Sequence, residues 1–257
     1  MYLPPLYTDN AWIVATALNT ALMVIAFLLP KKLLTPMGYA NAWLLGVIVW
    51  GALGWRAYAV VLFYFLVGSA VTKVGMAQKE AYGIAEARGG VRGPGNVWGS
   101  ALTAAVCALG VLCLQLVYPA ALEQWQPLLA LGFVASLSTK LSDTTATEVG
   151  KAYGQRTFLI TTLQPVSRGT EGAISLEGTL AGVIGSVTLA IVARAVGLIS
   201  FQGVIVCAIA AFVATTVESL IGATVEEKLA WLTHDFVNII NTTVGALLAI
   251  GLGWLWR

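Results

Sequence analysis

Charged residues are concentrated in one stretch of a sequence that otherwise avoids them. Between Ala135 and Gly185, carboxylates and cations alternate with glycines and hydroxyl residues in an apolar background. Carboxylates can hold a divalent ion and cations can neutralise phosphate, whereas a passive membrane anchor needs neither. The composition of this stretch therefore indicates a site that handles phosphate together with a metal ion, Mg²⁺ or Mn²⁺.

The first candidate motif is DTTATEVGKAYG, which is predicted to form a helix with Asp143 at its N-cap and Gly154 at its C-cap. Asp143 and Thr147 are four residues apart and share a helix face, and Glu148 lies on the flank of that face. Oxygen ligands at this spacing suit Mg²⁺, which takes one or two carboxylates plus substrate phosphates. In the alternative interpretation, Asp143 only caps the helix and Glu148 pairs with Lys151.

The second motif is the glycine-rich loop GGVRGPGNVWGS, which precedes a predicted helix. Glycines let backbone N–H groups approach an anion, and the helix N-terminus adds positive potential. The loop is therefore predicted to bind phosphate, with Arg92 as a bidentate clamp beside Gly93 and Asn96. The alternative is a flexible loop whose arginine follows only the charge bias of membrane proteins. The sequence contains no GxxxxGK[ST], which excludes a P-loop.

A third group of polar residues follows the turn at Pro165. Arg168, Thr170 and Glu171 come first, and Glu177 then lies at the mouth of the next apolar run. Because a lipid-facing carboxylate is unfavourable, Glu177 is expected to face the bundle interior or a hydrated cavity. The alternative for Glu177 is a hydrogen bond between helices.

The C-terminal third contributes fewer candidates. Glu218 ends the seventh apolar run, and Asn238 and Asn241 begin the last one. The two amides could coordinate ribose, phosphate or an ion, or could hydrogen-bond helices together. His234, next to Asp235, is interpreted as a helix-entry residue rather than a ligand.

Composition predicts the fold that positions these residues. Of 257 residues, 58% are hydrophobic and only 10% are charged, whereas a soluble domain has about a quarter charged. We therefore expect an all-α, polytopic transmembrane helix bundle forming a single integral membrane domain over 1–257. About eight spans are expected, or seven if the second and third merge into one bent hairpin. They are predicted at 11–29, 41–55, 57–72, 98–118, 127–141, 176–196, 200–218 and 236–256.

Charge asymmetry predicts the orientation. With the N-terminus outside, eleven of the fourteen Lys and Arg residues fall on one side, as the positive-inside rule requires of a cytoplasmic face. The loops 73–96, 140–175 and 218–238 are then all cytoplasmic and share one site. The stretch 73–88 is predicted to form a basic amphipathic helix. The N-terminus lacks signal and transit features, which favours a bacterial inner or thylakoid membrane protein.

Several long strings resemble the membrane family that includes cyanobacterial and plastid phytyl-phosphate kinases. They are KVGMAQKEAYGIAEARGGVRGPGNVWGS, SDTTATEVGKAYG, PVSRGTEGAISLEGTLAG and ESLIGATVEEK, so the resemblance covers most of residues 70–245. Glu218 stands where the family pattern more often has Asp. The resemblance implies phosphoryl transfer from a nucleoside triphosphate, with CTP as the implied donor, to phytyl monophosphate. The product, phytyl diphosphate, would serve phytol salvage toward tocopherol or related quinones.

The candidate residues suit that chemistry. A phosphate monoester has a second pKa of about 6 and is largely dianionic at neutral pH, so it needs no catalytic base. The reaction needs two polyanions neutralised and aligned. The predicted catalytic residues are Lys151, Arg92 and Arg168. Those predicted to bind the nucleotide and other phosphates are Lys73, Lys79, Arg88, Gly93, Asn96, Thr147, Thr170, Asn238 and Asn241. The predicted metal ligands are Asp143, Glu148, Glu171, Glu177 and Glu218.

Two other functions stay open at this point. A prenyl-alcohol kinase or a cytidylyltransferase-like lipid enzyme could use a related scaffold, although an alcohol nucleophile would want a general base. A transporter of an anionic or prenyl substrate would place its polar residues near the bilayer midplane, whereas here they lie at span ends. The expected partners are a prenyl-phosphate lipid, a nucleotide and membrane lipids, with a homo-oligomer left open. The net charge of +2 gives no indication of nucleic-acid binding.

Overall fold

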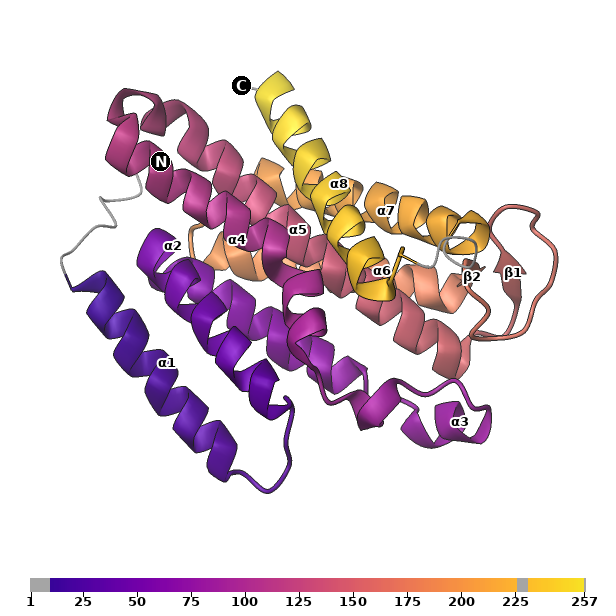
Figure 1. Ribbon diagram of the computed structural model, residues 1–257. Helices are drawn as coiled ribbons and strands as arrows, with labels where there is room; N and C mark the ends of the chain where they lie inside the picture. The colour runs from indigo at the N-terminus through magenta and orange to yellow at the C-terminus, as the bar shows by residue number, and fades with distance from the viewer. Residues whose placement is uncertain (1–9, 226–230, 257) are drawn as a thin grey trace.

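The computed structural model describes residues 10–225 and 231–256, apart from the side chains of residues 87 and 88. The described chain is almost entirely helical (Figure 1). Its elements are α1 (Ala11–Leu28), α2 (Pro36–Val71), α3 (Met76–Ala81), the 3₁₀ turn η1 (Ala87–Gly90), α4 (Pro94–Val117), α5 (Pro119–Tyr153), β1 (Thr157–Leu159), β2 (Ala173–Ser175), α6 (Leu176–Ala195), α7 (Phe201–Thr224) and α8 (His234–Leu255).

Six helices of the described chain are long and apolar enough to cross a membrane: α1, α2, α4, α6, α7 and α8. Their outward faces carry large aliphatic and aromatic side chains, such as Leu28 and Phe201, which are 77% and 70% exposed. Such a surface suits lipid rather than water. The expectation of an all-α polytopic membrane protein is confirmed, although these six helices do not map one to one onto the eight predicted spans.

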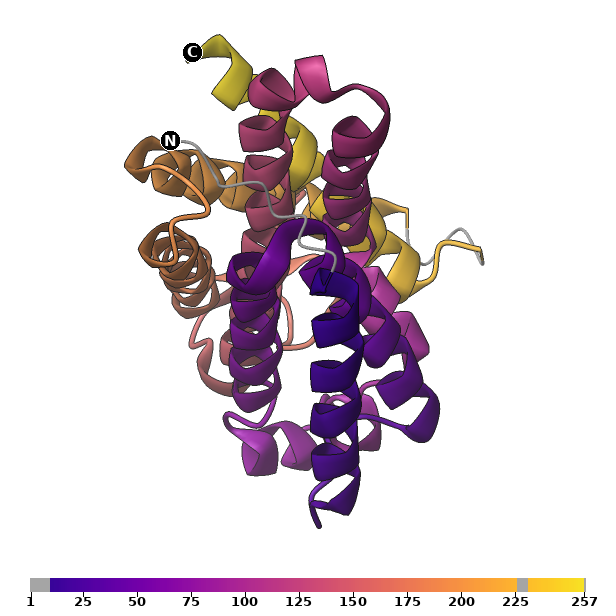
Figure 2. The same ribbon diagram turned by 90° about the vertical axis from the view of Figure 1, so that its left-hand side faces the viewer.

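Helix α2 contains two of the predicted spans. Its 36 residues are interrupted at Gly54, where φ is 75° and ψ is −172°, a conformation that essentially only glycine adopts. A Cβ on Gly38 would lie 2.7 Å from the carbonyl oxygen of Arg92, and one on Gly68 would lie 2.9 Å from its Nη2. Thirty residues of straight helix would separate these glycines by about 45 Å. The chain therefore reverses at Gly54, and the two arms run back along each other (Figures 1 and 2).

Helix α5 runs through the middle of the bundle and packs against α2, α4, α6, α7 and α8. Its apolar half is wholly buried at Phe133, Leu137 and Leu141. The predicted span 127–141 is too short, because α5 continues to Tyr153 with Gly154 as its C-cap. No glycine or proline interrupts residues 133–149, and some of the hydroxyl residues hydrogen-bond within the helix, as Thr145 Oγ1 does to Leu141 O at 2.7 Å.

One consequence is a correction at Asp143. The residue does not cap a helix start, because it lies well inside α5. The interpretation of Asp143 as an N-cap is therefore wrong, and its carboxylate is available for contacts with other elements.

Three connections gather at one end of the bundle, which we call the polar end: the α2–α4 segment with α3, the segment with β1 and β2, and the start of α8 (Figure 1). β1 and β2 pair antiparallel, with Phe158 opposite Ile174. The predicted amphipathic helix 73–88 is shorter than expected, because Gly75 and Gly83 have φ values of 60° and 68° and bound the six-residue α3.

Candidate active site

Two adjoining cavities lie at the polar end. The larger, of about 390 Å³, has α5 as its floor, α6 and α7 as its walls, and the segment 157–174 over it. The smaller, of about 80 Å³, lies between α4, α5, α8 and the segment 72–92. Asp143, Thr147, Lys151 and His234 line both cavities. The last turns of α5 therefore form the shared wall of one composite site.

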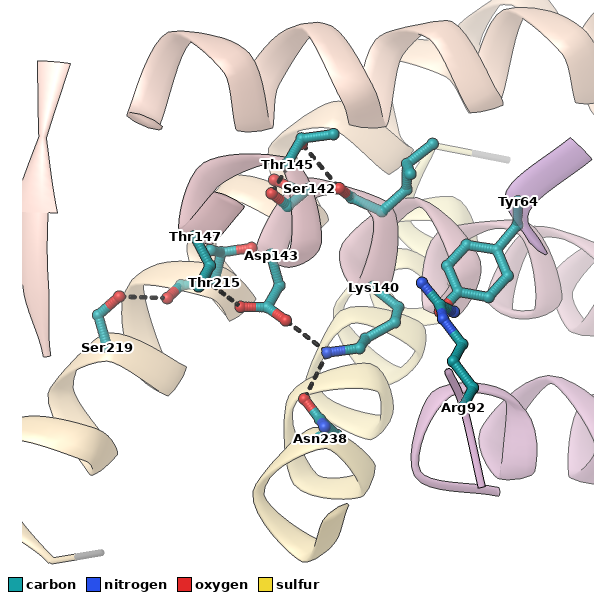
Figure 3. Close-up of polar contacts among 11 residues, drawn as sticks. Tyr64, Arg92, Lys140, Ser142, Asp143, Thr145, Thr147, Thr215, Ser219 and Asn238 are labelled. Carbon is teal, nitrogen blue, oxygen red and sulfur yellow. Dashed lines mark hydrogen bonds and ion pairs between the residues drawn. The ribbon is translucent and has the colours of Figure 1, made fainter. Parts of the chain in front are cut away.

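A buried lysine links α5 to α8 in this wall. Lys140 Nζ donates to Asp143 Oδ2 at 2.5 Å and to Asn238 Oδ1 at 2.6 Å (Figure 3). An ammonium group inside an apolar helix is tolerated only with such partners. Lys140 belongs to the charged stretch noted in the sequence, but it was assigned no role there. The signal that could have found it is its spacing of three residues from Asp143 on one helix face.

Two carboxyl groups meet in the larger cavity. Glu218 of α7 interacts with the carboxyl group of Asp143. Asp143 Oδ1, the oxygen that is not bonded to Lys140, lies 3.5 Å from Thr147 Oγ1. Within the described residues, Thr215 Oγ1 is buried without a hydrogen-bond partner, and it lies beside Ser219 and Thr147 (Figure 3). Two carboxyl groups beside one unpartnered hydroxyl fit Mg²⁺, which fills its remaining positions with water and phosphate oxygens.

The five predicted metal ligands do not form one cluster. Across 10–225 and 231–256, no group of three or more His, Cys, Asp or Glu side chains is placed to hold a metal ion. Glu171 lines the larger cavity from the segment above it. Glu177 Oε1 instead accepts from Gln155 N at 3.3 Å and lines neither cavity. A metal at this site would be held mainly by Asp143 and Glu218.

Two of the predicted catalytic cations face the larger cavity. Lys151 lines both cavities, and Arg168 lines the larger one beside Thr170. Arg168 Nη1 donates to Ala152 O at 3.2 Å, and its guanidinium lies 5.8 Å from the ring centre of Tyr82. These contacts fix the guanidinium over the cavity and leave donors for an anion.

Arg92 faces the smaller cavity. Its Nη1 donates to the hydroxyl of Tyr64 at 3.1 Å (Figure 3). Its backbone N–H donates to Leu33 O at 3.0 Å. The glycine-rich loop is therefore held by the connection that precedes α2 and by the second arm of α2. Asn96 lines the same cavity, but its Oδ1 caps α4 by accepting from Gly93 N at 2.9 Å.

Glu148, predicted as a metal ligand with pairing to Lys151 as the alternative, has a different ion-pair partner in the structure. Glu148 forms a buried ion pair with Lys79, whose Nζ also donates to Thr72 O at 2.7 Å. Lys79 is wholly buried and lines neither cavity, so it joins α3 to α5 rather than presenting its ammonium to phosphate. Glu148 still lines the smaller cavity.

Two other predicted residues, Lys73 and Asn241, line neither cavity. Lys73 is exposed on the α2–α3 turn. Asn241 is 1% exposed inside α8, and neither atom of its amide has a hydrogen-bond partner in the described part of the chain. The side chain of Arg88 and part of the predicted loop 218–238, residues 226–230, lie outside the described residues.

Comparison with known proteins identifies the family. Residues 19–246 match the model of the integral membrane protein family DUF92. The chain belongs to this family. It is 62% identical to an uncharacterized membrane protein of Synechocystis over 94% of this chain and 91% of that protein. It is 46% identical to the chloroplast protein VTE6 of Arabidopsis thaliana, over 93% of this chain and 71% of that protein.

More distant relatives extend to archaea. An uncharacterized membrane protein of Methanocaldococcus jannaschii is 28% identical over 88% of this chain and 89% of that protein. No solved structure matches the chain. The resemblance to cyanobacterial and plastid proteins is confirmed, because relatives from both sources match over nearly the whole chain.

Proposed function

We propose that this DUF92 protein is a phytyl-phosphate kinase, which transfers the terminal phosphoryl group of CTP to phytyl monophosphate. Its family membership and its identity to the chloroplast relative support the prenyl-phosphate kinase activity. The observation that carries the proposal is the meeting of Asp143 and Glu218 in a cavity that Lys151 and Arg168 also line. Carboxylates for Mg²⁺ and cations for phosphate are the parts that phosphoryl transfer requires.

The reaction needs charge neutralisation more than proton transfer. An oxygen of the acceptor phosphate attacks the γ-phosphorus of the nucleotide, and the bond from that phosphorus to the β,γ-bridging oxygen breaks, releasing the nucleoside diphosphate. Because the acceptor is already largely dianionic, no group has to remove a proton first. Lys151 and Arg168 bring the two polyanions together by offsetting their charge, and the hydroxyl of Thr215, which has no hydrogen-bond partner within the described residues, can donate to a phosphate oxygen.

Asp143 and Glu218 would hold Mg²⁺, or Mn²⁺ in its place, and the ion when bound would supply positive charge beside the transferred group. Lys140 and Asn238 fix the rotamer of Asp143 through the hydrogen bonds that they share. The carboxylate is thus oriented before any substrate arrives, and such preorganisation is worth more in a buried site than in water.

The setting of the reaction is part of the proposal. The topology predicted from the sequence puts eleven of the fourteen Lys and Arg residues on one side of the membrane, which supports a cytoplasmic site in a bacterial inner or thylakoid membrane. The phosphate of the lipid would then lie at headgroup level, where the cavities are. The product, phytyl diphosphate, would enter phytol salvage toward tocopherol or related quinones.

The decisive experiment uses purified protein in detergent with phytyl monophosphate and each nucleoside triphosphate, with and without Mg²⁺. We expect label from the γ-phosphate of CTP to appear in phytyl diphosphate only when Mg²⁺ is present. Label in lipid with phytol alone as acceptor would indicate an alcohol kinase, and label from the α-phosphate would indicate a cytidylyltransferase. Absence of any nucleotide-dependent product would favour a transporter.

A further inference from the structure

The larger cavity does not end at its polar groups. It continues along α6 to Val183 and along α7 to Phe212, which are 37% and 49% exposed on the outer surface of the bundle. The space that holds Asp143 and Glu218 therefore reaches the lipid-facing surface between α6 and α7.

The polar and apolar parts of this cavity lie at different depths. Phe212 precedes Glu218 by six residues on α7, which places it about 9 Å farther from the polar end along the helix axis. Thr215 and Thr216 line the wall between them. The cavity thus changes from charged to hydroxylated to apolar as it runs toward the membrane interior.

Close packing of α6 on α5 leaves the open side of the cavity between α6 and α7. A Cβ on Gly178 would lie 2.6 Å from Ala146 O, and one on Gly182 would lie 3.0 Å from Ser142 O. These two glycines therefore let α6 press its backbone onto α5. With α5 as a closed floor, Val183 and Phe212 mark the side of the cavity that faces outward between α6 and α7.

We propose that the prenyl chain of the acceptor enters and leaves through this gap between α6 and α7. The proposal rests on the proposed function and adds the path of the lipid. The phosphate would lie beside Asp143 and Glu218, and the first part of the chain would run past Thr215 and Thr216 to Val183 and Phe212. The rest of the prenyl chain would extend into the bilayer.

The size of the larger cavity supports a prenyl chain that extends out of the cavity into the bilayer. Its volume of about 390 Å³ is near the lower end of the roughly 300–1,000 Å³ of ligand pockets. Phosphate groups of two substrates and a twenty-carbon chain need more room than that. Because lipid tails are as apolar as the side chains of the gap, burial adds little affinity there. The gap would therefore discriminate between substrates by the width and shape of their prenyl chains rather than by affinity gained from burial.

Photocrosslinking tests the path directly. The probe is phytyl monophosphate with a diazirine in the half of the chain nearest the phosphate, added to the intact protein in nanodiscs. We expect crosslinks on the peptides around Val183 and Phe212, and we expect excess phytyl monophosphate, but not phytol, to suppress them. Suppressible crosslinks on α1, α2 or α8, or crosslinks on α6 and α7 that do not compete, would overturn the proposal.

A pair of variants gives a second readout. Val183→Trp narrows the gap, and Ile184→Trp adds the same bulk at the next residue, which is 66% exposed and does not line the cavity. We expect Val183→Trp to lower kcat/KM for phytyl monophosphate roughly tenfold, the size of one overpacked contact. For the five-carbon dimethylallyl phosphate, kcat/KM of Val183→Trp should change less than about twofold. The kcat/KM of Ile184→Trp should also change less than about twofold with either substrate.

The two proposals fail in different ways. If the same preparation forms no phytyl diphosphate with any nucleotide, the proposed function is wrong. If it forms the product but the crosslinks lie elsewhere, or both tryptophan variants behave alike, only the lipid path is wrong.

Discussion

The contact between Lys140 and Asp143 allows the structural and chemical roles of the site to be separated. Lys140→Met removes the ammonium that lies 2.5 Å from Asp143 Oδ2 and 2.6 Å from Asn238 Oδ1. It leaves two interacting carboxyl groups, Asp143 and Glu218, without their buried cation. Breaking a buried ion pair by removing one partner costs about 3–5 kcal/mol. For a chain of this size, that lowers the unfolding midpoint by about 6–20 °C.

Asp143→Asn breaks the same pair from the other side. It keeps an oxygen that can accept from Lys140 but removes the compensating charge, so we expect a comparable loss of stability. In the double variant Lys140→Met/Asp143→Asn neither charge remains. Its midpoint should therefore fall by clearly less than the sum of the two single effects, with a coupling of at least about 2 kcal/mol.

Across the two single variants and the double variant, the loss of turnover should not parallel the loss of stability. Asp143→Asn and the double variant both lack the carboxylate that would hold the metal, so both should lose at least about a hundredfold in kcat. The assays are thermal unfolding in detergent and formation of labelled phytyl diphosphate. Additive midpoint shifts in the double variant would show that Lys140 does not stabilise Asp143. Near-normal turnover by Asp143→Asn would refute the metal assignment.

Three further predictions concern other parts of the molecule. Lys79→Met should destabilise by about 3–5 kcal/mol, because it leaves Glu148 buried and alone, and Lys79→Met/Glu148→Met should recover much of that loss in thermal unfolding. Arg168→Ala should raise KM for phosphate substrates roughly tenfold or more in steady-state kinetics, because a charge-assisted donor over the cavity is lost. Gly54→Ala should destabilise by about 1–3 kcal/mol in thermal unfolding, because the reversal of α2 needs a positive φ.

Matched variants make these outcomes specific. Arg156→Ala removes an exposed arginine of the same segment that lines neither cavity, so KM should stay unchanged. Gly251→Ala places a methyl group where no described atom lies within 4 Å, inside helix α8, and should stabilise slightly. Equal KM changes in the two arginine variants, or equal destabilisation in the two glycine variants, would contradict the reasoning.

The fold was largely predictable because hydropathy and charge are local properties. Long apolar runs located the membrane helices, and Trp55-Arg56 marked the reversal of α2 to within two residues of Gly54. The predicted helix start at Asp143 was wrong, also for a local reason. An N-cap residue type was interpreted as a helix start, although the preceding residues have no helix breaker, and continuous packing on neighbouring helices outweighed that preference.

The pairings within the site were less predictable, because they join distant segments. Lys79 and Glu148 are 69 residues apart in sequence, and Lys140 and Asn238 are 98 apart. Spacing along one helix suggested only neighbours, so the only ion-pair partner considered for Glu148 was Lys151, in the alternative interpretation. The same limit left Thr215 unnoticed, since a hydroxyl in an apolar run gains meaning only when α7 places it beside Asp143 (Figure 3).

The opening between α6 and α7 affects how the enzyme's kinetics should be measured. A substrate that arrives from within the leaflet is encountered by two-dimensional diffusion, so its effective concentration is a mole fraction of the surrounding amphiphile. Adding detergent at a constant amount of lipid substrate would dilute that surface and slow the reaction, although nothing changes in the bulk solution. Product released through the same opening remains in the leaflet, where it competes with fresh acceptor until another membrane enzyme consumes it.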